Sequence, residues 1–344
     1  PERFTELDFQ HFFLQPKFNS EAARNVQAPN VIGPSSGEGL YGLRPVRSCL
    51  GIFDGACYGA TSGPTCAFLK EGAKVIATDL NWVPTGVSND DVDFFAELTG
   101  NDDVLVGTMD ITLQSHVDEI YNKSIDRFGT VDVVINNGGT RQRDLYLDTH
   151  GSVSMLDTDI SEWQKMFDTH VFGNLRVIKR FVQPMLAQKS GSIINTSSSQ
   201  LLNAHASGEG EPVFYGLSRE GSYQPAKAAM GSMTIYLAKE LQKDGIAVNL
   251  MMPGHTATTG SDEQEAVRNE IRQKLGLAPS NFTPRRVRAD NVVPLSLHLA
   301  EQTGEGVTGR WISAMAYNEE NGLGGFETWG VAGDVEAARA AGTL

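Results

Sequence analysis

The chain has 344 residues and a formal net charge of −14. That length suits one α/β domain with added segments, and an acidic charge without a basic stripe argues against nucleic acid or an anionic membrane as a partner. Three cysteines make no disulfide framework, which favours a reducing compartment. The sequence shows no membrane-spanning run and no signal-peptide pattern, so we expect a soluble, cytoplasmic protein.

Residues 1–46 form an N-terminal extension that mixes aromatic residues with proline and glycine. This composition is too apolar for a free disordered tail. We expect the extension to wrap around its own subunit or a neighbouring one in an oligomer. A regulatory or partner-docking role is the alternative.

The first predicted strand, 49–53, leads through a glycine-containing turn into a helix. The backbone N–H groups of such a turn, together with the helix dipole, bind a pyrophosphate, and glycine lets the backbone approach it. Gly55 and Gly59 occupy two of these places, with Tyr58 and Ala60 beside them. The turn therefore predicts a dinucleotide site.

The second predicted strand, 73–79, ends in Asp79, which Leu80 follows. An acidic residue about 20 positions past the turn can accept hydrogen bonds from both ribose hydroxyls and repel a 2′-phosphate. The alternative, an ordinary surface aspartate, is less favoured, because aspartate rarely ends a buried Val-Ile strand without an interaction partner. Asp79 therefore predicts NAD rather than NADP.

Two further strands are predicted after a polar insertion at 81–102. The strand beginning at Val104 ends near Asp110 and Ile111, where Asp110 can also cap the helix that follows. The strand at 131–135 precedes Asn136-Asn137-Gly138-Gly139.

Arg141 and Arg143 come next and belong on the rim of the expected site. Either could bind an acidic ligand, although pairing with Asp144 or Asp148 is the favoured reading.

A long helix is predicted from about Ser161 to Gln188, and it carries His170. One interpretation of His170 is a core histidine that hydrogen-bonds to the backbone. The other is a functional histidine, since a neutral imidazole has one donor and one acceptor nitrogen and titrates near neutral pH.

The strand beginning at Gly191 delivers Ser198 at its carboxyl end, and Tyr223 and Lys227 follow on a helix. Four residues apart, Tyr223 and Lys227 share one helix face, so the ammonium can favour the phenolate and make proton exchange accessible near neutral pH. Ser198 can hydrogen-bond a substrate oxygen. By itself the tyrosine–lysine spacing is common in amphipathic helices. The order of the other motifs along the chain is what favours a catalytic pair.

The remaining segments frame this set. A loop at 200–222 is expected to cover the substrate pocket, and Ser222 is a candidate N-cap. The strand at 245–251 precedes Pro253 and Gly254, and a variable lid spans about 254–288. A last strand at 307–312 precedes a tail that could reach an adjoining subunit. The basic cluster Arg285-Arg286-Val287-Arg288 is too short to be more than a local patch of positive charge.

Taken in order, these motifs resemble the short-chain dehydrogenase/reductase family from about Arg47 to Ile312. The resemblance implies that Tyr223 is the general acid/base, that Lys227 lowers its pKa and binds the nicotinamide ribose, and that Ser198 orients substrate. Relatives usually have asparagine in place of His170, where it holds a water in a proton relay. We therefore expect His170 to act in that relay and to add an ionisation in the neutral range.

The resemblance also assigns cofactor contacts along the carboxyl ends of the strands. They comprise Gly55, Tyr58, Gly59, Ala60, Asp79, Leu80, Asp110, Ile111, Asn137, Gly138, Gly139, Tyr223, Lys227, Pro253, Gly254, Thr256 and Thr258. Two residues depart from the family's glycine turn, Asp54 in place of threonine and Thr61 in place of the last glycine.

These observations predict a Rossmann-like, doubly wound parallel sheet with strand order 3-2-1-4-5-6-7. We expect an N-terminal extension at 1–46, a catalytic domain at 47–316 and a C-terminal tail at 317–344. The expected activity is NAD(H)-dependent interconversion of a secondary alcohol and a ketone, without a metal, in a homo-oligomer, either tetramer or dimer. Two alternatives stay open: a non-redox lyase, epimerase or isomerase that retains NAD, and a catalytically silent NAD-binding protein.

Overall fold

The computed structural model describes residues 48–52, 62–80, 98–140, 145, 153–198, 221–257, 273–274 and 285–344. The chain separates into two compact units, Pro1–Gly42 and Leu43–Leu344, and every described residue belongs to the second. The predicted N-terminal extension therefore lies outside the described residues. In the described part of the chain, no helix has the length and apolar character needed to cross a membrane.

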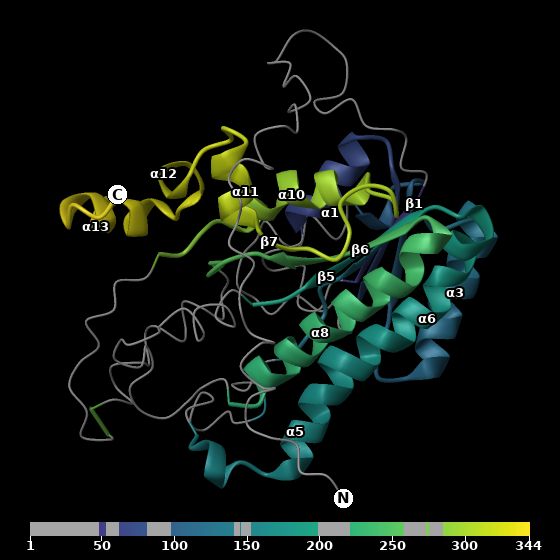
Figure 1. Ribbon diagram of the computed structural model, residues 1–344, viewed down its shortest axis with the longest axis horizontal. Coiled ribbons are helices and arrows are strands. Elements are labelled where there is room, and N and C mark those ends of the chain that lie inside the picture. Colours follow the sequence, from purple (N-terminus) through teal and green to yellow (C-terminus); the bar gives the residue numbers. More distant parts are fainter. Residues whose placement is uncertain are drawn as a thin grey trace, which may run out of the picture. The chain divides into compact units, whose positions relative to one another are not determined.

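A parallel sheet organises the described residues (Figure 1). Its strands are β1 Ser48–Ile52, β2 Lys74–Asp79, β3 Val104–Thr108, β4 Val133–Asn136, β5 Gly191–Thr196, β6 Ile246–Met252 and β7 Trp311–Ser313. Among the described residues these seven strands pair in the order β3-β2-β1-β4-β5-β6-β7, and every pairing is parallel. The α/β class with a parallel sheet, predicted from the sequence, is confirmed.

Helices connect and flank the strands. They are α1 Ser62–Lys70, α3 Gln114–Phe128, α5 Ile160–Phe167, α6 Asn174–Gln188, α8 Tyr223–Leu241, α10 Val293–Ala300, α11 Ala314–Glu320, α12 Phe326–Trp329 and α13 Ala332–Ala340. Short 3-10 turns occur at η4 Met155–Asp157, η6 Gln242–Asp244 and η7 Ala289–Val292. A π-helix, η5 Asp168–Gly173, joins α5 to α6.

The two faces of the sheet bury separate apolar cores, because successive strand residues point to opposite sides. Ile76, Val134 and Ile193 face α3, α6 and α8. Their chain neighbours Val75 and Ile194 face α1 and α10 on the other side (Figure 1). Both faces are covered, which explains why β2, β5 and β6 are buried along nearly their whole length rather than at alternate residues.

The segment after β7 is helical and packs on its own chain. α11 spans the position where the sequence placed the start of the tail, and Asn318 Nδ2 donates a hydrogen bond to the Asn291 carbonyl oxygen at 2.8 Å. Asn318 is fully buried. α11 therefore continues the packed structure on the α1 and α10 side of the sheet.

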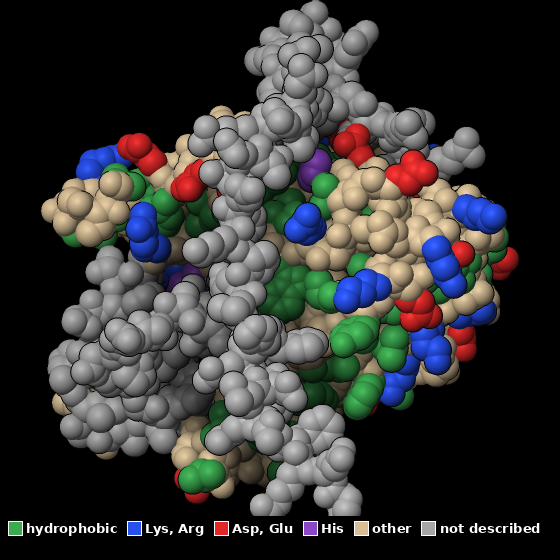
Figure 2. Space-filling view, in the orientation of Figure 1, with side chains coloured by type: hydrophobic (Ala, Val, Ile, Leu, Met, Phe, Trp, Pro, Cys, Tyr) green, Lys and Arg blue, Asp and Glu red, His purple; other side chains and the backbone are tan. Residues whose placement is uncertain are grey.

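Charged side chains of both signs are interspersed on the face of the described residues that Figure 2 shows. Individual ion pairs on the surface of the described residues include Lys123–Glu119 and Arg180–Asp118.

Candidate active site

Tyr223 and Lys227 lie on the first two turns of α8, at the end of the sheet where the parallel strands terminate. The Lys227 Nζ atom lies 5.5 Å from the centroid of the Tyr223 ring. Lys227 is 3% exposed and donates a hydrogen bond to the Thr196 carbonyl oxygen at the end of β5, at 2.8 Å. The sequence prediction that the two side chains share one helix face is confirmed, and a buried cation stands beside the half-buried tyrosine.

Ser198 lies just beyond β5, next to the start of α8. Its Oγ atom accepts a hydrogen bond from Gln224 Nε2 at 3.1 Å. The preceding Ser197 donates its N–H to the Met251 carbonyl oxygen in β6 at 2.8 Å. The backbone bond and the Gln224 contact together hold Ser198 next to the first turn of α8. Ser222 occupies the N-cap position of α8 as predicted, although its side chain makes no capping bond.

His170 reaches this cluster from the π-helix η5. Its ring lies edge-on to the Tyr223 ring, with centroids 5.1 Å apart and planes at 86°. Nε2 lies 2.7 Å from the Thr140 carbonyl oxygen, and because a carbonyl oxygen only accepts, Nε2 carries the proton. Nδ1 is buried and has no hydrogen-bond partner among the described residues.

The environment of His170 keeps the imidazole neutral. Burial lowers its pKa well below 6.5, the nearby Lys227 ammonium lowers it further, and the hydrogen bond to Thr140 opposes them only in part. This downward shift argues against the expectation that His170 adds an ionisation in the neutral range. The side chain is 1% exposed, and the buried lysine beside it makes an imidazolium unfavourable.

Gly139 leaves room for the His170 ring. A Cβ atom built on Gly139 would lie 2.2 Å from His170 Cε1, closer than any side chain tolerates. The glycine thus lets the segment after β4 pass against the imidazole that contacts Tyr223. Asn137 and Gly138, the neighbouring candidates, lie on the same segment.

A chain of buried polar side chains links β4, β5 and α8. Asn136 Nδ2 donates to Asn195 Oδ1 at 2.8 Å, and Asn195 Nδ2 donates to Thr234 Oγ1 at 2.9 Å. Thr234 in turn donates to the Met230 carbonyl oxygen. All three side chains are fully buried or nearly so. Asn136 thus links β4 to β5 and α8 through Asn195 and Thr234, which the sequence analysis missed.

The missed residues left a readable signal in the sequence. Asn195 interrupts a buried apolar strand, where an amide needs a partner. Gln224 and Thr140 gave no such signal, because their contacts with Ser198 and His170 form only when the chain folds.

The residues proposed to bind the adenosine half of a dinucleotide lie at the carboxyl ends of β2 and β3. Asp79, the last residue of β2, is 3% exposed, whereas Leu80 is 55% exposed. Asp110 accepts hydrogen bonds from the N–H and Oγ1 of Thr112 at 2.8 and 2.7 Å, which forms a turn before α3. The alternative that Asp110 caps the helix is not observed, because the N-cap of α3 is Leu113 and no described side chain makes a capping bond there. The Ile111 side chain is buried.

Pro253, Gly254 and Thr256 follow β6 at the same end of the sheet. Gly254 has φ +83°, a left-handed conformation that favours glycine. The Thr256 Oγ1 atom is buried and lacks a hydrogen-bond partner among the described residues.

A dinucleotide fits these residues. In doubly wound sheets, ligands bind beyond the carboxyl ends of the strands at the point where the strand order reverses, here between β1 and β4. Asp79 offers a buried carboxylate on one side of that point, and Thr256 offers an unsatisfied hydroxyl on the other.

Some candidates cannot be placed. Gly55, Tyr58, Gly59, Ala60, Thr258, Arg141 and Arg143 lie outside the described residues, as do the departures Asp54 and Thr61. The loop at 200–220 and most of the lid at 258–284 also lie outside them.

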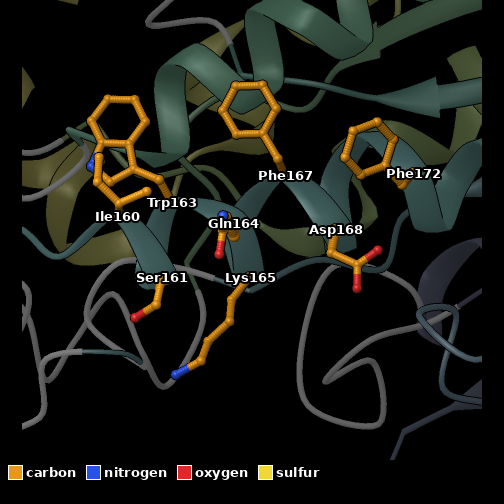
Figure 3. Close-up of a pocket in the computed structure, with 8 residues that line it drawn as sticks. All are labelled: Ile160, Ser161, Trp163, Gln164, Lys165, Phe167, Asp168 and Phe172. Atoms are coloured by element: carbon orange, nitrogen blue, oxygen red, sulfur yellow. The ribbon is translucent and has the colours of Figure 1, made fainter.

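A shallow groove of about 650 Å³ runs along α5 and η5 (Figure 3). Its lining is largely apolar and includes Ile160, Trp163, Phe167 and Phe172. None of the candidate catalytic residues lines it. The groove is therefore a surface feature separate from the candidate active site.

Fold and site together define an oxidoreductase of the doubly wound dinucleotide-binding class. A family profile described as Enoyl-(Acyl carrier protein) reductase matches residues 55–314. The chain belongs to the short-chain dehydrogenase/reductase family, whose members use NAD or NADP.

Individual relatives agree with this assignment. The chain is 39% identical over 264 residues to fluoren-9-ol dehydrogenase of Terrabacter sp. (strain DBF63), covering 76% of this chain and 69% of that one. It is 30% identical over 259 residues to dehydrogenase/reductase SDR family member 6 of Aquarana catesbeiana, covering 75% and 92%. The crystal structure of gox2181 superposes with a TM-score of 0.59 at 21% identity, covering 78% of this chain and 95% of that one, and shows the same fold.

Proposed function

We propose that this protein is an NAD(H)-dependent oxidoreductase that interconverts a secondary alcohol and a ketone, with Tyr223 as the general acid/base. The observation that carries the proposal is the cluster at the start of α8. The half-buried Tyr223 ring has a buried ammonium 5.5 Å from its centroid and a neutral imidazole in edge contact, with the two ring centroids 5.1 Å apart. Ser198 stands beside the same turn through Gln224.

Each side chain has one task in the oxidation. Bound NAD⁺ supplies the acceptor for the hydride that leaves the carbinol carbon. Tyr223 takes the hydroxyl proton as the C–H bond breaks and the C=O bond forms. Lys227 favours the phenolate that receives this proton, and Ser198 donates a hydrogen bond to the substrate oxygen. In the reverse direction Tyr223 returns the proton to the alkoxide.

We assign His170 a positioning role rather than a place in the proton relay. Anchored to Thr140 through Nε2, its ring contacts the Tyr223 ring and limits how that ring can turn. Because His170 is neutral, the positive charge next to the Tyr223 phenol comes from the Lys227 ammonium.

Burial of Asp79 supports NAD over NADP, because a 2′-phosphate would meet a buried carboxylate at the end of β2. The name of the fluoren-9-ol relative supports a bulky, apolar secondary alcohol as substrate.

The exposed side chains of Ile160, Phe172 and Tyr236, on α5, η5 and α8, support a homo-oligomer, either dimer or tetramer. Sedimentation velocity tests this by measuring the mass of the particle in solution. A cytoplasmic location stays a prediction.

The test is Tyr223→Phe, followed at the NADH absorbance with fluoren-9-ol and simpler secondary alcohols. Removal of the transferable proton should lower kcat/KM by about 10²–10⁴-fold. NAD affinity, measured by calorimetry, should change little. Tyr236→Phe is the matched control, since Tyr236 lies on the same helix, is 70% exposed and has its own lysine neighbour, Lys239.

An active Tyr223→Phe enzyme contradicts the mechanism. If the unmutated protein binds NAD but yields no net NADH with any alcohol, the alternatives of a non-redox enzyme or a silent NAD-binding protein gain support.

A further inference from the structure

Val287 pairs with two segments that are far apart in the sequence. On one side its N–H donates to the His255 carbonyl oxygen at 2.9 Å, and its carbonyl oxygen accepts from the Ala257 N–H at 2.8 Å. On the other side Val287 bridges to Gly330 in antiparallel fashion. Three short segments, 255–257, 286–288 and 329–331, thus form one small ladder, and Thr256 lies between the two residues that bond to Val287.

A buried ion pair secures the outer segment of this ladder. Arg286 donates from its backbone N and from Nε to Asp334 Oδ2, both at 2.9 Å, and from Nη2 to Asp334 Oδ1 at 2.7 Å. The side chains are 17% and 7% exposed. The hydrogen bonds from Arg286 hold the pKa of Asp334 below its usual value, and the charge of His255 acts in the same direction.

The other arginines of the basic cluster contact the same tail. Arg285 lies over the Phe326 ring and Arg288 over the Trp329 ring, at 4.6 and 5.5 Å from the ring centroids. Arg288 also donates to the Thr328 carbonyl oxygen at 3.1 Å.

Backbone bonds complete the attachment, from Arg288 N to the Trp329 oxygen and from Val331 N to the Arg286 oxygen. The cluster that the sequence suggested was a local patch is therefore an anchor for residues 326–334.

Gly330 permits this approach. A Cβ atom there would lie 2.5 Å from Val335 Cγ2 and 2.6 Å from the Phe326 carbonyl oxygen. The ladder needs a residue without a side chain at the point where the tail crosses Val287.

We propose that residues 326–334, with Arg285, Arg286 and Arg288, form a C-terminal clamp that fixes the segment 253–257 in its place beside the cofactor site, and that Arg286 and Asp334 are positioning residues for Thr256. The inference rests on the proposed function, because it assigns 253–257 to the nicotinamide end of that site. The clamp acts through Val287, which holds the backbone on either side of Thr256.

The experiment uses the full-length protein and Asp334→Asn, which keeps the side-chain volume and removes the charge. Arg339→Gln is the matched control. It breaks the ion pair between Arg339 and Glu327, which lies within the same tail but is exposed on both sides. Two readouts are compared: amide hydrogen exchange at Ala257 and Val287 without cofactor, and the separate KM and kcat values for NAD.

In Asp334→Asn, exchange at both amides should rise by about tenfold or more, because the ladder opens locally more often. KM for NAD should rise several-fold, roughly three- to tenfold, with kcat changed less than about twofold. Arg339→Gln should match the unmutated protein in both readouts. If Asp334→Asn does not fold, Arg286→Lys gives the same readouts, since lysine keeps the charge but loses the paired contact.

Exchange at Ala257 and Val287 that equals the unmutated rate in a folded variant overturns the clamp. Faster exchange confined to residues 326–334 also overturns it, because the tail would then loosen without affecting 253–257. The exchange measurement needs no turnover, so it separates failure of the clamp from failure of the proposed oxidoreductase activity.

Discussion

His170 illustrates how packing decides the chemistry of a single residue. An imidazole in solution titrates near neutral pH, and from the sequence that property pointed to a proton relay. In the fold the ring is enclosed by Gly139, Thr140 and Tyr223, with the Lys227 ammonium near enough to lower its pKa. The residue type was visible in the sequence, but its protonation state depends on neighbours that the sequence does not place.

The resulting prediction concerns the pH dependence of His170→Asn. Because the folded pKa of His170 is lowered well below 6.5, the imidazole stays neutral at and above neutral pH and only protonates in acid. The kcat/KM profiles of both proteins should therefore show the same number of ionisations between about pH 6 and 8. The absolute rate should fall in the variant, since asparagine cannot fill the space beside the Tyr223 ring.

His298→Asn is a suitable control because His298 lies on α10, outside the candidate site, where its ring packs against Tyr317 with the centroids 5.2 Å apart. An ionisation near neutrality that disappears in His170→Asn alone would show that the relay interpretation was right.

At the scale of elements, apolar runs bounded by turns located each strand to within a few residues. The last strand begins later than predicted. Residues 307–310 bond instead to side chains and backbone of β6: Asn249 Nδ2 donates to the Val307 oxygen, and Asn249 Oδ1 accepts from the Arg310 N–H. Periodicity also predicted one continuous helix at 161–188, whereas the structure inserts the π-helix η5, whose wider turn carries His170.

The polar chain between elements gives a stability prediction. Asn195→Ala removes the acceptor of Asn136 Nδ2 and the donor to Thr234 in a fully buried site. Leaving buried polar groups unsatisfied should lower the free energy of unfolding by about 1–3 kcal/mol. Denaturant unfolding measures the change. Asn122→Ala, which loses an exposed contact with Arg180, should change the free energy by much less. Equal losses would show that the buried chain adds nothing to stability.

At the scale of the described unit, the topology places the candidate site. Parallel strands end together, and ligands of doubly wound sheets bind at that end, where the strand order reverses, here between β1 and β4. The chain order of Asp79, Ser198, Tyr223 and Thr256 was readable in the sequence, and their gathering at one end of the sheet follows from parallel pairing. The attachment of the tail was not readable, since an Arg286–Asp334 contact has no periodicity or spacing that would predict it.

Ligand-linked stability tests the cofactor preference of the whole protein. A ligand that binds only the native state at 100 times its Kd adds about 2.7 kcal/mol to the free energy of unfolding. NAD should therefore raise Tm more than NADP at equal concentration. Asp79→Ala should shrink that difference. Asp103→Ala, which removes the partner of Lys74 at the opposite end of β2, should preserve it. Equal Tm shifts from the two cofactors in the unmutated protein would contradict the assignment of Asp79.

The small ladder around Val287 also bears on biosynthesis. Its inner segment, 255–257, is translated well before Gly330 and Asp334. During translation Arg286 therefore spends a period without the carboxylate that later neutralises it, and a guanidinium in that position is costly to bury alone. Ribosome-bound chains that stop before residue 326 should thus show faster amide exchange at Ala257 and Val287 than the finished protein, in which both N–H groups are hydrogen-bonded.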